Sequence, residues 1–73
     1  MRPEHEKMRL KYVIGMPDRA IKAFHRCGFT TVGDILEIKD REAFLKIRDI
    51  GFHTYFQTLK ALEDEGFDVS HLR

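Results

Sequence analysis

The sequence predicts one compact all-α domain of four to five helices, and three observations support that prediction. The chain has 73 residues, which is enough for one domain and too few for two. Glycine and proline divide it into short segments, within which apolar residues recur at helical spacing. No segment alternates long enough to indicate a strand. We expect residues 1–9 to form a charged flexible tail and residues 10–73 to form the helical domain.

A lead-in segment and a first helix are expected at the start of the domain. Residues 10–16 carry several apolar side chains and should cross the core as an extended or turning segment. A helix is predicted over residues 17–27, because Pro17 favours the first turn of a helix and Asp18 suits its positive end. Gly28 then offers a left-handed stop.

Two short helices should follow. One is predicted over residues 32–36 with Thr31 as its cap, and one over residues 41–47 with Asp40 as its cap. Their core candidates are Val32, Ile35, Leu36, Phe44, Leu45 and Ile47.

The longest helix is expected between Gly51, which opens it, and Gly66, which closes it. Its apolar residues recur at i, i+3, i+4, i+7 and i+10, which predicts an inward-facing stripe. The stripe consists of Phe52, Tyr55, Phe56, Leu59 and Leu62. The alternative for Phe52 is an exposed position, which would suit a protein contact better than a phosphate contact. Beyond the helix, Phe67, Val69 and Leu72 are expected to fold back as a short apolar tail.

Charge and cysteine content narrow the class of protein. The net charge is +1, but residues 1–30 hold seven Lys or Arg against three Asp or Glu, and residues 31–73 hold six against nine. The first half therefore suits a polyanion better than the second, although an ordinary solvated surface would also explain the asymmetry. With one cysteine, no secretory signal and no long apolar run, we expect a cytoplasmic protein that does not enter a membrane.

Residues 47–54 have the outline of a helix-hairpin-helix, in which a short helix, a tight turn and a new helix follow one another. The first N–H groups of a helix lack internal partners, and the dipole makes that end positive. Gly51 would let a phosphate approach this end closely, and the hydroxyl of Thr54 would add a hydrogen bond. The alternative is that Gly51 is only a turn residue and Thr54 only a first-turn residue.

A second candidate feature is the basic face of the first helix. Arg19, Lys22 and Arg26 follow one another at spacings of three and four, so they share one side. An arginine projecting from a helix start can enter a narrow minor groove, where the potential is most negative. A solvated face opposite the core is the equally ordinary alternative.

An ordered series of motifs resembles the C-terminal domain of the bacterial RNA polymerase α subunit. The series comprises R-A-I-K-A-F at residues 19–24, G-F-T-T-V-G-D-I at 28–35, Ile-Gly at 50–51, Leu62 and Gly-Phe at 66–67. The resemblance covers about residues 10–70 and implies a helix-hairpin-helix-like fold, a SAM-like orthogonal bundle that binds DNA in the minor groove.

Carried over position by position, the resemblance implies roles for five residues. Arg19 matches the groove-reading arginine, and Lys22 stands where the family usually has asparagine. Ala23 holds a small position packed against the DNA backbone, Gly51 matches the turn glycine, and Thr54 matches the family serine.

The departures from the family pattern concern the turn. The family usually carries a basic pair after its glycine, where this chain has Phe52 and His53, and Gln57 replaces a common acidic residue. Losing the pair removes phosphate contacts, which Lys22 offsets in part. The candidate nucleic-acid-binding residues are Arg19, Lys22, Ala23, Arg26, Gly51, His53, Thr54 and Gln57.

Catalytic and metal chemistry are not expected. His25 and Cys27 diverge on a helix, Cys27 should be a small buried residue, and residues 63–65 fit a solvated helix end. No cofactor is implied. We therefore expect a non-enzymatic, transcription-related module that binds A·T-rich DNA weakly, with transcription regulators or RNA polymerase subunits as candidate protein partners. The alternatives are an adaptor of the same fold that has lost DNA binding, and an accessory domain of a nuclease, helicase or repair enzyme.

Overall fold

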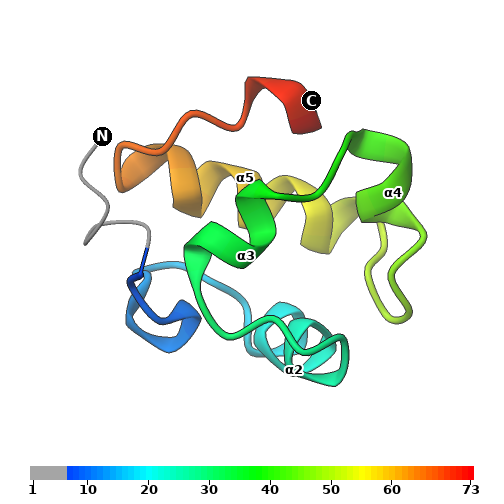
Figure 1. Cartoon of the computed structure of the whole chain (residues 1–73), viewed down its shortest axis with the longest axis horizontal. Helices are drawn as coiled ribbons and strands as arrows, with labels where there is room; N and C mark the ends of the chain where they lie inside the picture. The colour runs from blue at the N-terminus through cyan, green and yellow to red at the C-terminus, as the bar shows by residue number, and fades with distance from the viewer. Residues whose placement is uncertain (1–6) are drawn as a thin grey trace.

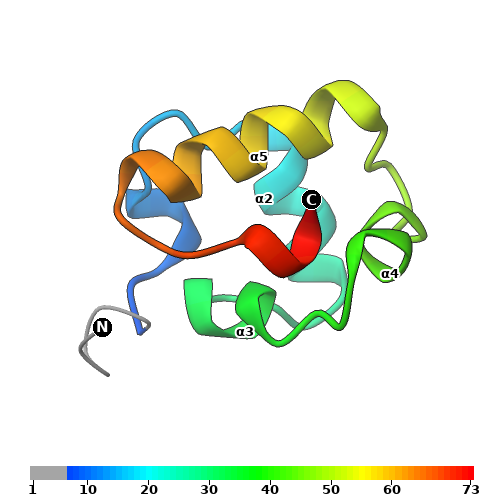
Figure 2. The same ribbon diagram turned by 90° about the horizontal axis from the view of Figure 1, so that it is seen from above.

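In the computed structural model, which describes residues 7–73, the longest helix packs against the helix of residues 18–26, and the C-terminal segment folds back alongside it (Figures 1 and 2). This arrangement confirms the predicted all-α class for the described residues, which form four α-helices and no strand beyond an isolated bridge. The elements are η1 (Leu10–Tyr12), α2 (Asp18–Arg26), α3 (Val32–Leu36), α4 (Arg41–Leu45), α5 (Phe52–Asp64) and η2 (Ser70–Leu72).

The two short helices begin at the predicted caps. The Thr31 hydroxyl accepts a hydrogen bond from the Asp34 amide, and the Asp34 carboxylate accepts from the Thr31 amide, which completes a capping box. The amide of Thr30 donates to the same carboxylate at 2.9 Å. These backbone donors, Thr30 first, lower the pKa of Asp34 below its ordinary value. At α4, the carboxylate of Asp40 accepts from the Ala43 amide at 2.9 Å.

The helix bounds otherwise differ slightly from prediction. Pro17 lies just outside α2 as its N-cap, with φ −65°, and α2 ends at Arg26. Gly28 follows in the left-handed region with φ 84°, as expected for a helix stop. The helix predicted over 41–47 stops at Leu45, and residues 46–51 form a loop instead. Ile47, expected in the core, is only partly buried there.

The start of the described chain is joined to the turn before α3. The carbonyl of Met8 accepts a hydrogen bond from the Val32 amide at 2.9 Å, and the Leu10 amide donates to the Thr30 carbonyl. Met8 also packs against the core. Residues 1–6 of the expected tail lie outside the described residues, and residues 8–9 are part of the packed domain rather than of a tail.

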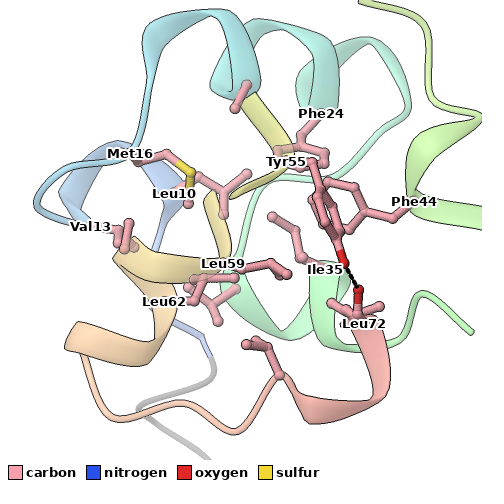
Figure 3. Packing of buried hydrophobic residues seen from close by; sticks show 14 of the residues in the cluster. Leu10, Val13, Met16, Phe24, Ile35, Phe44, Tyr55, Leu59, Leu62 and Leu72 are labelled. Carbon is pink, nitrogen blue, oxygen red and sulfur yellow. Dashed lines mark hydrogen bonds between the residues drawn. The ribbon is translucent and has the colours of Figure 1, made fainter. Parts of the chain in front are cut away.

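The core joins all the helices around a line of aromatic rings (Figure 3). Phe24 of α2 meets Phe44 of α4 edge-on at 5.6 Å, and Phe44 meets Tyr55 of α5 at 5.3 Å. The Tyr55 hydroxyl donates to the carbonyl of Leu72, so the C-terminal turn is tied to the middle of the core. The remaining fully buried large residues are Leu10, Val32, Ile35, Leu59, Leu62 and Val69, with Thr58 among them.

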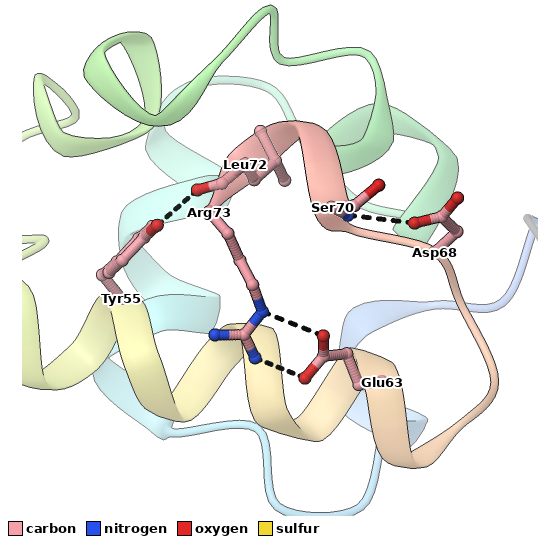
Figure 4. Close-up of polar contacts among 6 residues, drawn as sticks. All are labelled: Tyr55, Glu63, Asp68, Ser70, Leu72 and Arg73. Atoms are coloured by element: carbon pink, nitrogen blue, oxygen red, sulfur yellow. Dashed lines mark hydrogen bonds and ion pairs between the residues drawn. The ribbon is translucent and has the colours of Figure 1, made fainter.

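The C-terminal segment folds back over α5, as predicted (Figures 2 and 4). Phe67, Val69 and Leu72 are all buried. Arg73 forms an exposed ion pair with Glu63 of α5, and this bond lowers the pKa of the Glu63 carboxyl. Asp68 accepts a hydrogen bond from the Ser70 amide at 3.0 Å, which lowers the pKa of Asp68.

The predicted inward stripe of α5 is wrong at two positions. Phe52 and Phe56 are 65% and 55% exposed. The buried side of α5 is rotated toward threonines, because Thr58 satisfies its hydroxyl by donating to the carbonyl of Thr54 at 2.8 Å. Tyr55, Leu59 and Leu62 keep their predicted places, and Thr54, Thr58 and Ala61 complete the buried face.

Three further residues differ from expectation. Cys27 is exposed rather than buried, because it caps the end of α2 beside Gly28 and lies outside the buried positions of that helix. In the lead-in segment, Tyr12 and Ile14 are 61% and 82% exposed. Leu10, Val13 and Met16 alone of that segment's large side chains point into the core.

Candidate nucleic-acid interface

The three cations of α2 line one open surface hollow of about 490 Å³, together with Asp49 from the α4–α5 loop. The cations face solvent because another side of α2 packs against the core. Its buried side chains are Ala20, Ala23 and Phe24. The exposed face therefore presents Arg19, Lys22 and Arg26 together, as their spacing predicted.

Asp49 sets the electrostatics of this hollow. Its carboxylate forms an ion pair with Arg26, with side chains that are 46% and 62% exposed. An exposed pair of this kind contributes little to stability, roughly 0–1 kcal/mol. Arg19 and Lys22 form no ion pair with any residue that the structure describes. The hollow thus holds three cations and one anion, of which Arg26 alone is compensated.

The amino end of α5 lies directly after the loop that supplies Asp49. Gly51 is the N-cap of α5, with no side-chain cap and no acidic residue in the first turn. A Cβ at Gly51 would meet nothing within 4 Å, so the backbone there is open. The first N–H groups of α5 have no intrahelical partner, and the helix dipole makes this end positive.

The two predicted features come together through the loop of residues 46–51. Asp49 lines the hollow of α2 and precedes Gly51 by two residues. Gly51 and His53 are exposed but do not line the hollow itself. The surface is therefore a cationic hollow with the positive end of a helix next to it.

Two of the predicted residues are buried. Ala23 is 1% exposed and Thr54 is 7% exposed, because both belong to the packed faces of their helices. Gln57 is exposed, but it lines a separate hollow with Ile14 and Lys60.

Asp49 lines the candidate site, although the sequence did not indicate it. It adopts a left-handed conformation with φ 71°, which aspartate tolerates better than most residues. The tripeptide Asp49-Ile50-Gly51 is consistent with a turn. Nothing in the local sequence shows that the carboxylate meets a helix 23 residues earlier.

The described residues contain no cluster of His, Cys, Asp or Glu suited to a metal ion. None of the helices in that same part of the chain is long and apolar enough to cross a membrane. Comparison with known proteins finds no family model that matches the chain, and no curated protein or solved structure that is significantly similar to it.

Proposed function

We propose that this protein is a non-enzymatic, transcription-related DNA-binding module that contacts DNA through α2 and the start of α5. The observation that carries the proposal is the shared hollow of Arg19, Lys22 and Arg26, with two of the three cations free of carboxylate partners among the described residues. Cations grouped on one helix face attract the phosphate backbone of DNA.

The chemistry of the surface assigns separate tasks to its parts. Arg19 lies in the first turn of α2, where its guanidinium can extend into an A·T-rich minor groove. Lys22 and Arg26 face the adjacent phosphates, and the open amides after Gly51 accept a phosphate oxygen. Because Asp49 repels phosphate from the same hollow, binding should be weak and strongly dependent on salt.

The finer fold assignment belongs to the same proposal. The pair of α4 and α5, joined by the loop of residues 46–51, has the order of a helix-hairpin-helix. The motifs that resemble the RNA polymerase α C-terminal domain fall on α2, on α3 and the turn before it, and within and just beyond both ends of α5. These features support a SAM-like bundle with regulators or polymerase subunits as protein partners.

Fluorescence anisotropy with an A·T-rich duplex at low salt tests the proposal. Arg19→Ala should weaken binding at least about fivefold, the loss expected when one arginine contact is removed. Arg41→Ala is the matched control, because Arg41 is also an exposed first-turn arginine but lies outside the hollow. Equal affinities for the two variants, or no binding at about 1 mM protein, would refute the assignment.

A protein adaptor is the second candidate, and the exposed ring pair of α5 favours it. Phe52 and Phe56 stack with centroids 6.4 Å apart on the surface. Exposed aromatic residues of this size are enriched in protein interfaces. An adaptor without DNA binding would give identical anisotropy for the free duplex and the duplex mixed with protein.

A further inference from the structure

The solvent-facing side of α5 carries an exposed strip that begins with two phenylalanines and ends with two charged residues. We define the outer strip as Phe52, Phe56, Lys60 and Glu63, which recur at i, i+4, i+8 and i+11 on one side of the helix. All four side chains are exposed. This spacing of three and four residues is that of a helix seam.

The two phenylalanines of the outer strip are large apolar side chains that are exposed to water. Phe52 and Phe56 are more than half exposed, although the rest of the aromatic line, Phe24, Phe44 and Tyr55, is at most 1% exposed. The two rings stack on each other with planes 27° apart, so they form one continuous apolar surface. Hydrophobic surface of this kind favours a contact that removes it from water.

The charges at the two ends of α5 indicate which molecule would cover the outer strip. The amino end has no acidic residue in its first turn, and the carboxyl end has no basic residue in its last turn. The carboxyl end instead carries Glu63, which Arg73 pairs, and then Asp64 and Glu65, which form no ion pair with a described residue. The positive end of the dipole is thus left without acidic compensation, and the negative end carries further negative charge.

We propose that a second copy of this chain docks on the outer strip, with the two α5 helices antiparallel. A two-fold axis near residues 57–58 then places Phe56 of each copy beside the ammonium of the other copy's Lys60. The same symmetry brings the carboxyl end of α5 near the amino end of the other α5, where the dipole attracts the unpaired carboxylate of Asp64. Each copy therefore presents the same surface to the other, and the groups that attract one another all lie on that surface, as an isologous interface requires.

The interaction should be weak. Four side chains per copy bury much less than the roughly 1,200 Å² of a stable specific interface. We expect dissociation constants between about 10 µM and 1 mM. Sedimentation velocity across this concentration range should show the average mass rising from the monomer toward the dimer.

Two variants distinguish this contact from non-specific association. Phe56→Ser should abolish the concentration dependence, and both rings of the strip are exposed, so folding should be unaffected. Tyr12→Ser is the matched control, because Tyr12 is 61% exposed and lies on η1 rather than on α5. A dimer that survives Phe56→Ser, or that Tyr12→Ser weakens equally, overturns the proposal.

Paramagnetic relaxation tests the antiparallel direction. A nitroxide on Asp64→Cys, in a chain where the exposed Cys27 is replaced by Ser, is mixed with an isotope-labelled copy without nitroxide. Broadening of the Phe52 and His53 amides is the expected result. Broadening confined to residues 60–64 would show a parallel pair, and a constant monomer mass at about 1 mM would exclude the dimer; either result overturns the proposal.

Arg19→Ala should leave dimerisation unchanged, so failure of the DNA proposal is distinguishable from failure of this one.

Discussion

The carboxylate of Asp49 competes with phosphate for the cations of α2. It pairs with Arg26 in the hollow that Arg19 and Lys22 also line. Asp49→Asn should raise the affinity for an A·T-rich duplex by roughly two- to fivefold at low salt, corresponding to about 0.5–1 kcal/mol. Asparagine tolerates the left-handed backbone at φ 71°, so the fold should persist.

A control for Asp49→Asn removes the same charge elsewhere. Asp64→Asn takes a carboxylate from the far end of α5, outside the hollow. It should raise DNA affinity much less than Asp49→Asn, as measured by anisotropy in the same buffer. Equal increases would show that only net charge matters and that the hollow has no special role.

The buried hydroxyl of Tyr55 anchors the C-terminal turn. It donates to the Leu72 carbonyl, and both residues are at most 1% exposed (Figure 4). Tyr55→Phe leaves this carbonyl without its donor and should lower the free energy of unfolding by about 1–2 kcal/mol. Urea denaturation measures the change, with exposed Tyr12→Phe as a control expected within about 0.5 kcal/mol of the parent.

At the scale of elements, the capping box of α3 gives the stability a defined pH dependence. The pKa of Asp34 is held below its ordinary value of 3.8 by the amides of Thr30 and Thr31. Because the folded state binds this proton more weakly than the unfolded chain, the stabilisation is complete above the unfolded pKa and is lost as the pH falls through the folded pKa.

Thermal unfolding between about pH 6 and pH 2 tests this contribution. Asp34→Asn should lower the melting temperature at pH 6 and should flatten the decline below about pH 4. Glu37→Gln, which removes an exposed carboxylate at the other end of α3, should leave the shape of the curve unchanged. A parent-like pH profile for Asp34→Asn would contradict the role given to the capping box.

A substitution at the start of α5 should raise the stability of the fold and lower its affinity for DNA. Gly51 has an extended φ of −96° and an open Cβ position, so a side chain fits there without strain. Gly51→Asp should cap the first turn and stabilise the fold by about 0.5 kcal/mol. The added carboxylate should also weaken DNA binding, as seen by comparing calorimetry and anisotropy on the same variant. Weaker binding without stabilisation, or the reverse, would contradict the assigned N-terminus.

Helix ends that carry a local capping or stop signal were predictable from the sequence. The rotation of a helix about its own axis was not. The caps Thr31 and Asp40 and the stop at Gly28 act through neighbours within about four residues, so the sequence carries their signal. The rotation of α5 depends on Thr58 finding an acceptor one turn earlier, which makes a polar residue suitable for the core. Counting apolar residues alone therefore placed Phe52 and Phe56 inside.

At the scale of the whole molecule, the cationic hollow was predictable in part. The spacing of Arg19, Lys22 and Arg26 fixed their common face, because a helix repeats every 3.6 residues or so. Asp49 joins them only through the packing of Phe24, Phe44 and Tyr55, which brings the α4–α5 loop to α2. A contact made by tertiary packing leaves no trace in the local sequence.

Chemical-shift mapping with an A·T-rich duplex tests whether α2 and the start of α5 form one DNA-binding surface. We expect the amide signals of Arg19, Lys22, Arg26, Gly51 and His53 to shift together along one binding curve that weakens with salt. No shifts at those positions, or shifts confined to the outer strip of Phe52, Phe56, Lys60 and Glu63, would show that α2 and the start of α5 do not form such a surface.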